Sequence, residues 1–196
     1  MDLQFTDKEA SKVRWKIDLI VLPCFLLTQA LQFMDKTALN YANLFGYKEA
    51  LNLKGLEFNY LSAMVYAGYF FGQYPCGWLI GRFPAQKVMA ISILMWGFTV
   101  IILTQCRTFS SALAVRFIMG IFEAAVTPGL TLMTGFFYTR REIPLRQCIW
   151  YSSLGWGGIV GSYISMGVSE LPVDMTPERW ELIFYIVSLR ADLLPR

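Results

Sequence analysis

The chain has 196 residues, of which 56% are hydrophobic and 16% are charged, and its mean hydropathy is +0.46. A soluble globular domain has about 45–50% apolar and about 25% charged residues, so this chain has too few polar residues to cover a water-facing surface. The net charge of +3 without a dense basic run argues against nucleic-acid binding, and the absence of histidine removes the usual catalytic base and metal ligand. We therefore expect an all-α integral membrane protein and not an enzyme.

The N-terminal residues 1–16 are polar and basic, and no small-residue cleavage site follows the apolar stretch after them. We predict that they form a short cytosolic tail. A membrane-spanning helix needs about 20 apolar residues, and the first candidate covers 17–41. Pro23 near its start is compatible with a membrane helix, where neighbouring groups can satisfy the freed backbone.

Five further helices complete a predicted transmembrane bundle over 17–187. They are predicted over 60–80, 88–105, 112–138, 147–168 and 180–189. The last offers only about ten apolar residues, which extend roughly 15 Å as a helix, about half of the hydrocarbon core. It either lies at the membrane interface or belongs to a truncated form of a longer chain. We favour truncation, with a divergent tail over 188–196.

Positive charge in the loops predicts the orientation. Lys and Arg are more numerous in the N-terminal tail and in the loops that would share its side than in the other loops. Because Lys and Arg are enriched in cytoplasmic loops, we expect a multi-pass protein whose N-terminus is cytosolic. The acidic loop before the sixth helix then lies outside.

Two charged pairs interrupt otherwise apolar, membrane-length segments. Asp35 and Lys36 lie in the first predicted helix, and Arg116 and Glu123 lie in the fourth. A charge at bilayer depth costs at least about 3 kcal/mol, so it usually faces a bundle interior or an aqueous cavity and marks a solute or proton pathway. These pairs favour a membrane transporter, in which inverted three-helix repeats commonly place the site at their interface.

The depth of each charge follows from its position along its helix. At about 1.5 Å per residue, Asp35, Lys36 and Arg116 can share one layer in the outer part of the bundle. Glu123 lies seven residues beyond Arg116, which places it about 10 Å deeper on nearly the same helix face. One face of the fourth helix is therefore expected to carry a cation above a carboxylate.

This arrangement suits the proton-coupled carriage of an anion. Lys36 and Arg116 can hold a carboxylate, Arg116 with two hydrogen bonds and Lys36 as a point charge. A carboxyl group in a low-dielectric site can exchange a proton near neutral pH, which makes Asp35 or Glu123 the candidate proton carrier. Asn40 is a weaker candidate for substrate contact. The alternative is that Asp35–Lys36 and Arg116–Glu123 neutralise each other as packing salt bridges, with Lys36 extended toward the outer interface.

Small residues predict where helices approach closely. Gly68 and Gly72, and likewise Gly157 and Gly161, have the spacing that permits close helix packing in membranes. The segment 127–129, Thr-Pro-Gly, predicts a kink below Glu123. The widely spaced cysteines are interpreted as free thiols that act as small hydrophobes. They are Cys24, Cys76, Cys106 and Cys148.

Several segments resemble a known family. Residues 77–87, GWLIGRFPAQK, resemble the loop signature of the major facilitator superfamily, Gly-x-Leu-x-Asp-Arg-x-Gly-Arg-Lys. Residues 116–129, RFIMGIFEAAVTPG, resemble the helix-4 motif of its anion:cation symporter branch. FMDKTALNYANLFG, GYFFGQYPCGWLIGRFP and RREIPLR are similar to fungal allantoate permease-like members of that branch. The resemblance covers about residues 15–187.

The resemblance implies the N-terminal six-helix half of a major facilitator fold, with the sixth helix incomplete. It implies proton-coupled import of an allantoate-, vitamin- or carboxylate-like anion across the plasma membrane by alternating access. Substrate binding is then expected at Lys36 and Arg116, and proton coupling at Asp35 and Glu123. The sequence itself has no phosphate-binding glycine loop, nucleophile elbow or metal motif, so no cofactor and no metal are expected.

Two departures from the family pattern bear on function. The signature loop, with Gly77, Arg82 and Lys87 as gating residues, has Gly81 where the family has aspartate, so no gating salt bridge can start from that position. Family members have about twelve helices, so a missing second half, or a full-length relative, is expected as partner beside the lipid bilayer, the anion and protons. The alternative function is a truncated, non-transporting membrane protein with a regulatory or binding role, or with none.

Overall fold

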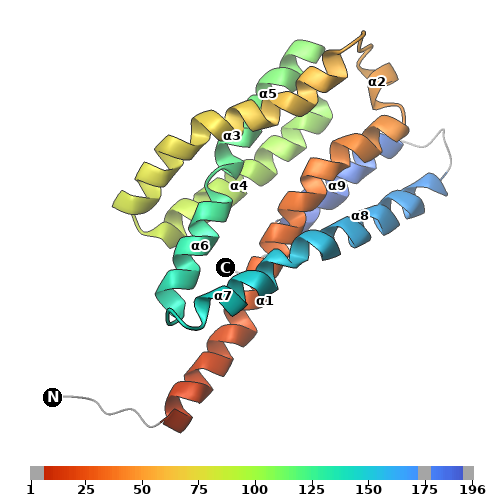
Figure 1. Cartoon of the computed structure of the whole chain (residues 1–196). Coiled ribbons are helices and arrows are strands. Elements are labelled where there is room, and N and C mark those ends of the chain that lie inside the picture. The colour runs from red at the N-terminus through yellow and green to blue at the C-terminus, as the bar shows by residue number, and fades with distance from the viewer. Residues whose placement is uncertain (1–6, 172–177, 192–196) are drawn as a thin grey trace.

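The computed structural model describes residues 7–171 and 178–191, and the regular elements within these ranges are all α-helices (Figure 1). The helices are α1 (Asp7–Leu44), α2 (Tyr47–Ala50), α3 (Glu57–Arg82), α4 (Ala85–Gln105), α5 (Phe109–Glu123), α6 (Val126–Phe137), α7 (Ile143–Tyr151), α8 (Ser153–Ser169) and α9 (Arg179–Ala191).

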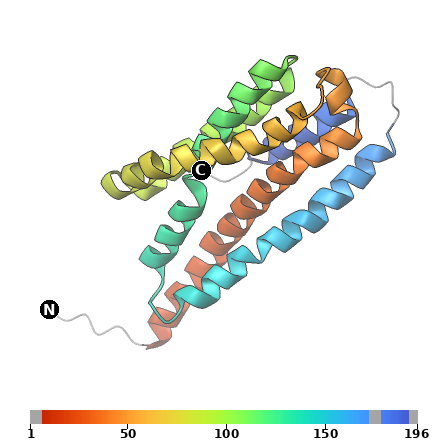
Figure 2. The same ribbon diagram turned by 45° about the horizontal axis from the view of Figure 1, so that its top comes forward.

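The long helices from the first half of the sequence pack mainly against helices from the second half. Helix α3 packs mainly against α5, whereas α8 runs beside α1 (Figure 2). Helix α4 contacts both α5 and α9, and α9 also packs against α1. The first three predicted spans therefore interleave with the last three, which brings α1 and α5, the two helices that carry the buried charges, into the same bundle.

Glycines set the close approach of α3 and α5. A Cβ atom added at Gly68 would collide with the backbone carbonyl of Phe117, and one added at Gly120 would collide with the carbonyl of Val65. The two backbones are thus in direct contact, as small residues permit between membrane helices. A Cβ at Gly157 of α8 would likewise lie 2.8 Å from the carbonyl oxygen of Ala30 on α1.

The fourth predicted span is divided into α5 and α6. Helix α5 ends at Glu123 and α6 begins at Val126, so the break comes before the expected kink at 127–129. Pro128 explains the position, because proline lacks an N–H group and its ring clashes with the carbonyl four residues earlier, which here is that of Ala124. The break places Glu123 at the last turn of α5.

Helix boundaries differ from the sequence prediction at the N-terminal end. Helix α1 begins at Asp7, so residues 7–16 of the predicted tail continue the first helix, and residues 1–6 lie outside the described part. Among the described residues, three stretches are long and apolar enough to cross a membrane: Ser11–Leu44, Ala85–Gln105 and Phe109–Phe137. Helix α3 has 26 residues, but its tyrosines, glutamine and glycines lower its hydropathy.

Helix α9, the short sixth segment, packs into the bundle. Trp180, Ile183 and Phe184 are almost completely buried against the other helices, and α9 runs next to α1 and α4. It is thus an integral member of the helix bundle. The helix continues to Ala191, and residues 192–196 of the predicted divergent tail lie outside the described part.

Candidate functional site

Four ionisable side chains from α1 and α5 form what we call the charged layer: Asp35, Lys36, Arg116 and Glu123. Asp35 and Glu123 are fully buried, and Arg116 is 2% exposed. The Lys36 side chain keeps 33% of its surface accessible. The four charged residues predicted from the sequence therefore lie together, and three of their side chains are buried.

The charges pair between helices and not within them. Lys36 Nζ lies 3.0 Å from Glu123 Oε1, an ion pair that joins α1 to α5. Depth along the helix had grouped Lys36 with Asp35 and Arg116, and the packing alternative had paired Arg116 with Glu123. Lys36, Asp35 and Arg116 do line one pocket, as the depth along the helices predicted. The pairing of Arg116 with Glu123 is not observed, because the long lysine side chain reaches across to the last turn of α5. The ring of Tyr69 on α3 lies 5.7 Å from the Lys36 ammonium and adds a cation–π contact.

Asp35 and Arg116 form the other, less satisfied half of the charged layer. They interact electrostatically across the α1–α5 interface, yet neither carboxylate oxygen of Asp35 has a hydrogen-bond partner. The Nε and Nη2 atoms of Arg116 are also unpartnered. Buried polar groups are normally hydrogen-bonded. The unpartnered oxygens of Asp35 and nitrogens of Arg116 therefore indicate a site that can bind a ligand, a proton or water.

A small pocket opens directly onto these charges. Its cavity volume is about 90 Å³. It is lined by Asp35, Lys36, Leu39, Asn40, Ser62, Val65, Tyr66 and Arg116. The predicted substrate contacts Lys36, Arg116 and Asn40 therefore share one cavity with Asp35, whereas Glu123 does not line it. Sequence analysis had not singled out Ser62, because a lone serine in an apolar helix carries no pattern.

A wider and more open groove lies next to the charged layer, between α3 and α6. Its volume is about 670 Å³, and its lining includes Tyr69, Gln73, Thr127 and Thr131. Tyr69 belongs both to this groove and to the contact with Lys36. The side chain of Tyr69 thus connects the groove to the Lys36–Glu123 ion pair.

The predicted gating residues lie apart from the charged layer, at the turn between α3 and α4. Arg82, in the last turn of α3, is exposed and its guanidinium lies 5.9 Å from the ring of Trp78. Lys87 is exposed in the first turns of α4. A Cβ atom added at Gly77 would meet nothing within 4 Å. The structure does not bring these residues together with Lys36 or Arg116.

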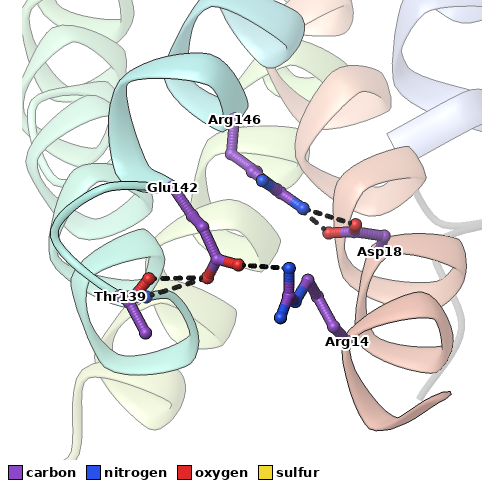
Figure 3. A network of polar contacts seen from close by, with 5 residues as sticks. All are labelled: Arg14, Asp18, Thr139, Glu142 and Arg146. Carbon is purple, nitrogen blue, oxygen red and sulfur yellow. Dashed lines mark hydrogen bonds and ion pairs between the residues drawn. The ribbon is translucent and has the colours of Figure 1, made fainter. Parts of the chain in front are cut away.

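A second polar cluster, which could not be identified from the sequence, joins the first turns of α1 to the α6–α7 loop and the start of α7 (Figure 3). We call it the loop network: Arg14, Asp18, Thr139, Glu142 and Arg146. Arg146 donates from Nε and Nη2 to the two carboxylate oxygens of Asp18, at 3.4 and 2.9 Å. Arg14 Nη1 lies 2.8 Å from Glu142 Oε1.

Glu142 also organises its own loop. It accepts hydrogen bonds from the backbone N–H and the hydroxyl of Thr139, at 3.3 and 2.8 Å (Figure 3). The hydroxyl bond, followed by the backbone bond and then the positive charge of Arg14, holds the pKa of Glu142 below its ordinary value. Every charge in the loop network thus has a partner, in contrast to the charged layer.

Within the described part of the chain, no three His, Cys, Asp or Glu side chains gather in a way that could hold a metal ion. The four cysteines are free thiols, of which Cys76 and Cys106 are buried and Cys148 is exposed.

Comparison with known proteins places the chain in a family. The family model described as Major Facilitator Superfamily matches residues 25–189. The fold matches a crystal structure of a bacterial homologue of the human lysosomal transporter Spinster, in an inward-facing and occupied conformation. The TM-score is 0.77 at 18% sequence identity, over 89% of this chain and 43% of that chain.

Fungal transporters are similar in sequence. An uncharacterised transporter of Schizosaccharomyces pombe is 35% identical over 97% of this chain and 36% of its own length. The thiamine pathway transporter THI73 of Saccharomyces cerevisiae is 35% identical over 91% of this chain and 34% of its length. The allantoate permease of S. cerevisiae is 27% identical over 96% and 35%.

The chain spans about a third of the length of these curated relatives. Without the one-turn α2, and with α5–α6 and α7–α8 counted as one segment each, the described residues form six helical segments, which correspond to a half of the family fold with a short sixth helix. The residues that carry the charged layer all lie within the matched range. This chain is an integral membrane protein and belongs to the Major Facilitator Superfamily.

Proposed function

We propose that this chain is the substrate-binding half of a secondary transporter that carries a small organic anion together with protons by alternating access. The observation that carries the proposal is the buried charged layer, in which one cation is held by a carboxylate and the other keeps free donors above a pocket. Such charge within membrane helices is expensive and is typical of solute or proton pathways.

Arg116 is the proposed anchor for the anion. Its unpartnered Nε and Nη2 atoms and its position in the pocket lining leave it able to form two parallel hydrogen bonds with a carboxylate. Lys36 lines the same pocket and would add a second positive charge. Asn40 and Ser62 can accept or donate hydrogen bonds at the edge of the pocket and would help to orient the substrate.

Glu123 is the proposed proton carrier, and its ion pair with Lys36 is the proposed coupling element. While Glu123 is ionised, it holds the Lys36 ammonium at 3.0 Å. A proton on Glu123 removes that attraction, so the ammonium becomes free to hold the substrate carboxylate. Asp35 is proposed as a second titrating group, because the substrate carboxylate would replace it as the negative charge next to Arg116.

The pocket supports this proposal only as part of a larger site. Small-molecule sites usually have volumes of about 300–1,000 Å³, and the pocket here measures about 90 Å³. The remaining wall would come from a second half, either the continuation of this chain or a full-length relative. A single half without such a wall would not alternate its access between the two sides of the membrane.

The relatives guide the choice of substrates. One is named as an allantoate permease, and we propose small carboxylates of that kind as the substrate class. We further propose a plasma-membrane location with the N-terminus in the cytosol. The exposed aromatic and aliphatic side chains of α3 and α8, such as Phe70, Tyr74, Trp156 and Tyr163, would contact lipid or the second half.

The test compares the chain with a completed transporter, in which residues 1–187 are continued by the C-terminal part of the 35% identical S. pombe relative. Both are reconstituted into proteoliposomes and supplied with radiolabelled allantoate, nicotinate, pantothenate or biotin. The completed transporter should take up at least one anion faster under an inward proton gradient. Equal uptake with and without the gradient would contradict proton coupling.

The chain alone gives the second arm of this test. It should insert into the membrane without driving uptake, because the pocket lacks a wall. The alternative is a non-transporting, regulatory membrane protein. It would be favoured if the completed transporter took up none of these anions and the chain bound stably to a full-length relative.

A further inference from the structure

The short helix α9 contributes a ring to the charged layer, which neither the sequence pattern nor the pocket lining reveals. Phe184 is fully buried, and the centre of its ring lies 5.8 Å from Arg116 Cζ. This distance is within the range of a cation–π interaction, in which the negative face of the ring attracts a guanidinium group. A side chain of α9 therefore contacts the guanidinium group of Arg116, which belongs to α5.

The Phe184 ring is itself held in place by two other buried rings. Its centroid lies 6.0 Å from that of Tyr47 on α2 and 6.4 Å from that of Trp180, and the rings of Tyr47 and Trp180 are 5.2 Å apart in an edge-to-face arrangement. All three side chains are fully buried. Such ring clusters favour one fixed arrangement.

A charged contact fixes the first turn of α9 above these rings. Arg107 Nη2, from the α4–α5 loop, lies 2.6 Å from Glu181 Oε1, and the Arg107 guanidinium lies 5.5 Å from the Trp180 ring. The loop that precedes the helix of Arg116 is thus joined to the helix of Phe184. The ring and the guanidinium have little freedom to separate.

The physical consequence concerns hydrogen-bond donors. A guanidinium group has five N–H donors in one plane, and a carboxylate that pairs with it edge-on occupies two of them. A ring face stabilises the same positive charge and occupies none. Arg116 lies near Asp35, but its Nε and Nη2 donors are unpartnered and so are both oxygens of Asp35. The ring offers a charge partner that leaves the donors available.

We propose that Phe184 is a positioning residue for Arg116: its ring holds the guanidinium off Asp35 and keeps two donors free for the carboxylate of the substrate. This inference rests on the proposed function, because it gives the free donors their task. It adds α9 to the site and predicts that a residue with no polar atom controls the affinity for the anion.

The matched control is Phe25, which is 5% exposed in a separate apolar cluster with Leu22, Met89, Val126, Leu130 and Trp150. Phe25→Leu and Phe184→Leu make the same change of side chain at two buried positions. A second pair of variants places 3,4,5-trifluorophenylalanine at position 184 or 25. Fluorination keeps the shape of the ring but weakens its negative face, so it separates attraction from packing.

The first measurement needs no substrate and uses the chain itself. Melting temperatures in detergent are compared in a double-mutant cycle of Arg116→Gln with Phe184→Leu, and in a control cycle of Arg116→Gln with Phe25→Leu. We expect the effects to be non-additive in the first cycle and additive in the second, because residues in contact couple and distant ones do not. Additive effects in both cycles would overturn the proposal.

The second measurement is the uptake of radiolabelled allantoate, or of the best anion in the panel, by the completed transporter. Trifluorophenylalanine at position 184 should raise KM by about three- to tenfold, the range that a cation–π contact supports, and leave kcat within about twofold. The same residue at position 25 should change neither. Unchanged KM at position 184, in a transporter that Arg116→Gln inactivates, would also overturn the proposal.

The two measurements distinguish this inference from the proposed function. If Arg116→Gln leaves uptake intact, the proposed function fails, whatever the cycle shows. If Arg116→Gln stops uptake but the cycle shows no coupling to Phe184, only the positioning role fails.

Discussion

The charged layer and the loop network use the same kinds of side chain in opposite ways. In the loop network, Arg146 and Asp18 form two hydrogen bonds at the edge of the bundle, and Glu142 is satisfied by Arg14 and Thr139. In the charged layer, Asp35, Arg116 and Glu123 are more deeply buried, yet neither carboxylate oxygen of Asp35 has a partner at hydrogen-bond distance. Fully paired charges in a partly buried cluster are typical of a structural role, whereas buried charges with unpaired donors and acceptors are typical of a functional site.

The largest effect is expected from Arg116→Gln in the completed transporter. The substitution removes the proposed anchor and leaves Asp35 without the positive charge that affects it most, so uptake should fall by at least about 30-fold, the cost of truncating a buried charge partner. Initial uptake rates at an anion concentration below the KM of the parent give the measurement. Arg14→Gln in the loop network serves as the matched control and should leave uptake near the parent rate. Loss of uptake in both variants would erase the difference between the two regions.

Glu123→Gln is expected to have a smaller but more specific effect. The amide imitates a protonated carboxyl, so Lys36 is no longer held by charge and the proton gradient has nothing to act on. Gradient-driven uptake should fall by about tenfold, equivalent to about 1.4 kcal/mol, while exchange of labelled for unlabelled anion continues. Uptake that still responds to the gradient would transfer the coupling role away from Glu123.

Asp18→Asn in the loop network is expected to affect stability and not transport. Its carboxylate pairs with Arg146, whose side chain is 12% exposed, so the loss should destabilise the protein by about 1 kcal/mol. The melting temperature should fall by about 2–4 °C, and KM should not change. A changed KM with an unchanged melting temperature would assign the loop network to the site.

The smallest effect concerns pH. Because the pKa of Glu142 is lower in the folded protein than its ordinary value of 4.5, its ionised form stabilises the fold at every pH above that value. This contribution is lost as the pH falls through the lowered pKa. Glu142→Gln should therefore lower the melting temperature slightly at pH 7 and have no effect once the acid is protonated. An equal difference at pH 7 and at pH 3 would contradict this.

Sequence analysis could identify the four residues of the charged layer because ionisable groups within apolar segments stand out without any structure. It could not predict that Lys36 reaches Glu123, because depth along each helix says nothing of how helices are rotated and how far a lysine stem extends. Phe184 gave no signal, since a phenylalanine in an apolar segment is usually core. The break after Glu123 was anticipated one turn late, because proline acts on the carbonyl four residues before it.

The loop network was missed for a related reason. Arg14, Arg146 and their neighbours lie where the positive-inside rule expects basic residues, so topology explained them before any pairing was considered. Only the packing of α1 against α7 shows that Asp18 meets Arg146.

Exchanging the charges of the Lys36–Glu123 pair tests the account most directly. The double variant Lys36→Glu with Glu123→Lys keeps an ion pair between α1 and α5 but reverses its direction, and the corresponding exchange of Asp18 with Arg146 does the same in the loop network. We predict that the first exchange abolishes anion uptake by the completed transporter, and that the second preserves it. Uptake at the parent rate after the exchange of Lys36 and Glu123 would mean that this pair only packs two helices together.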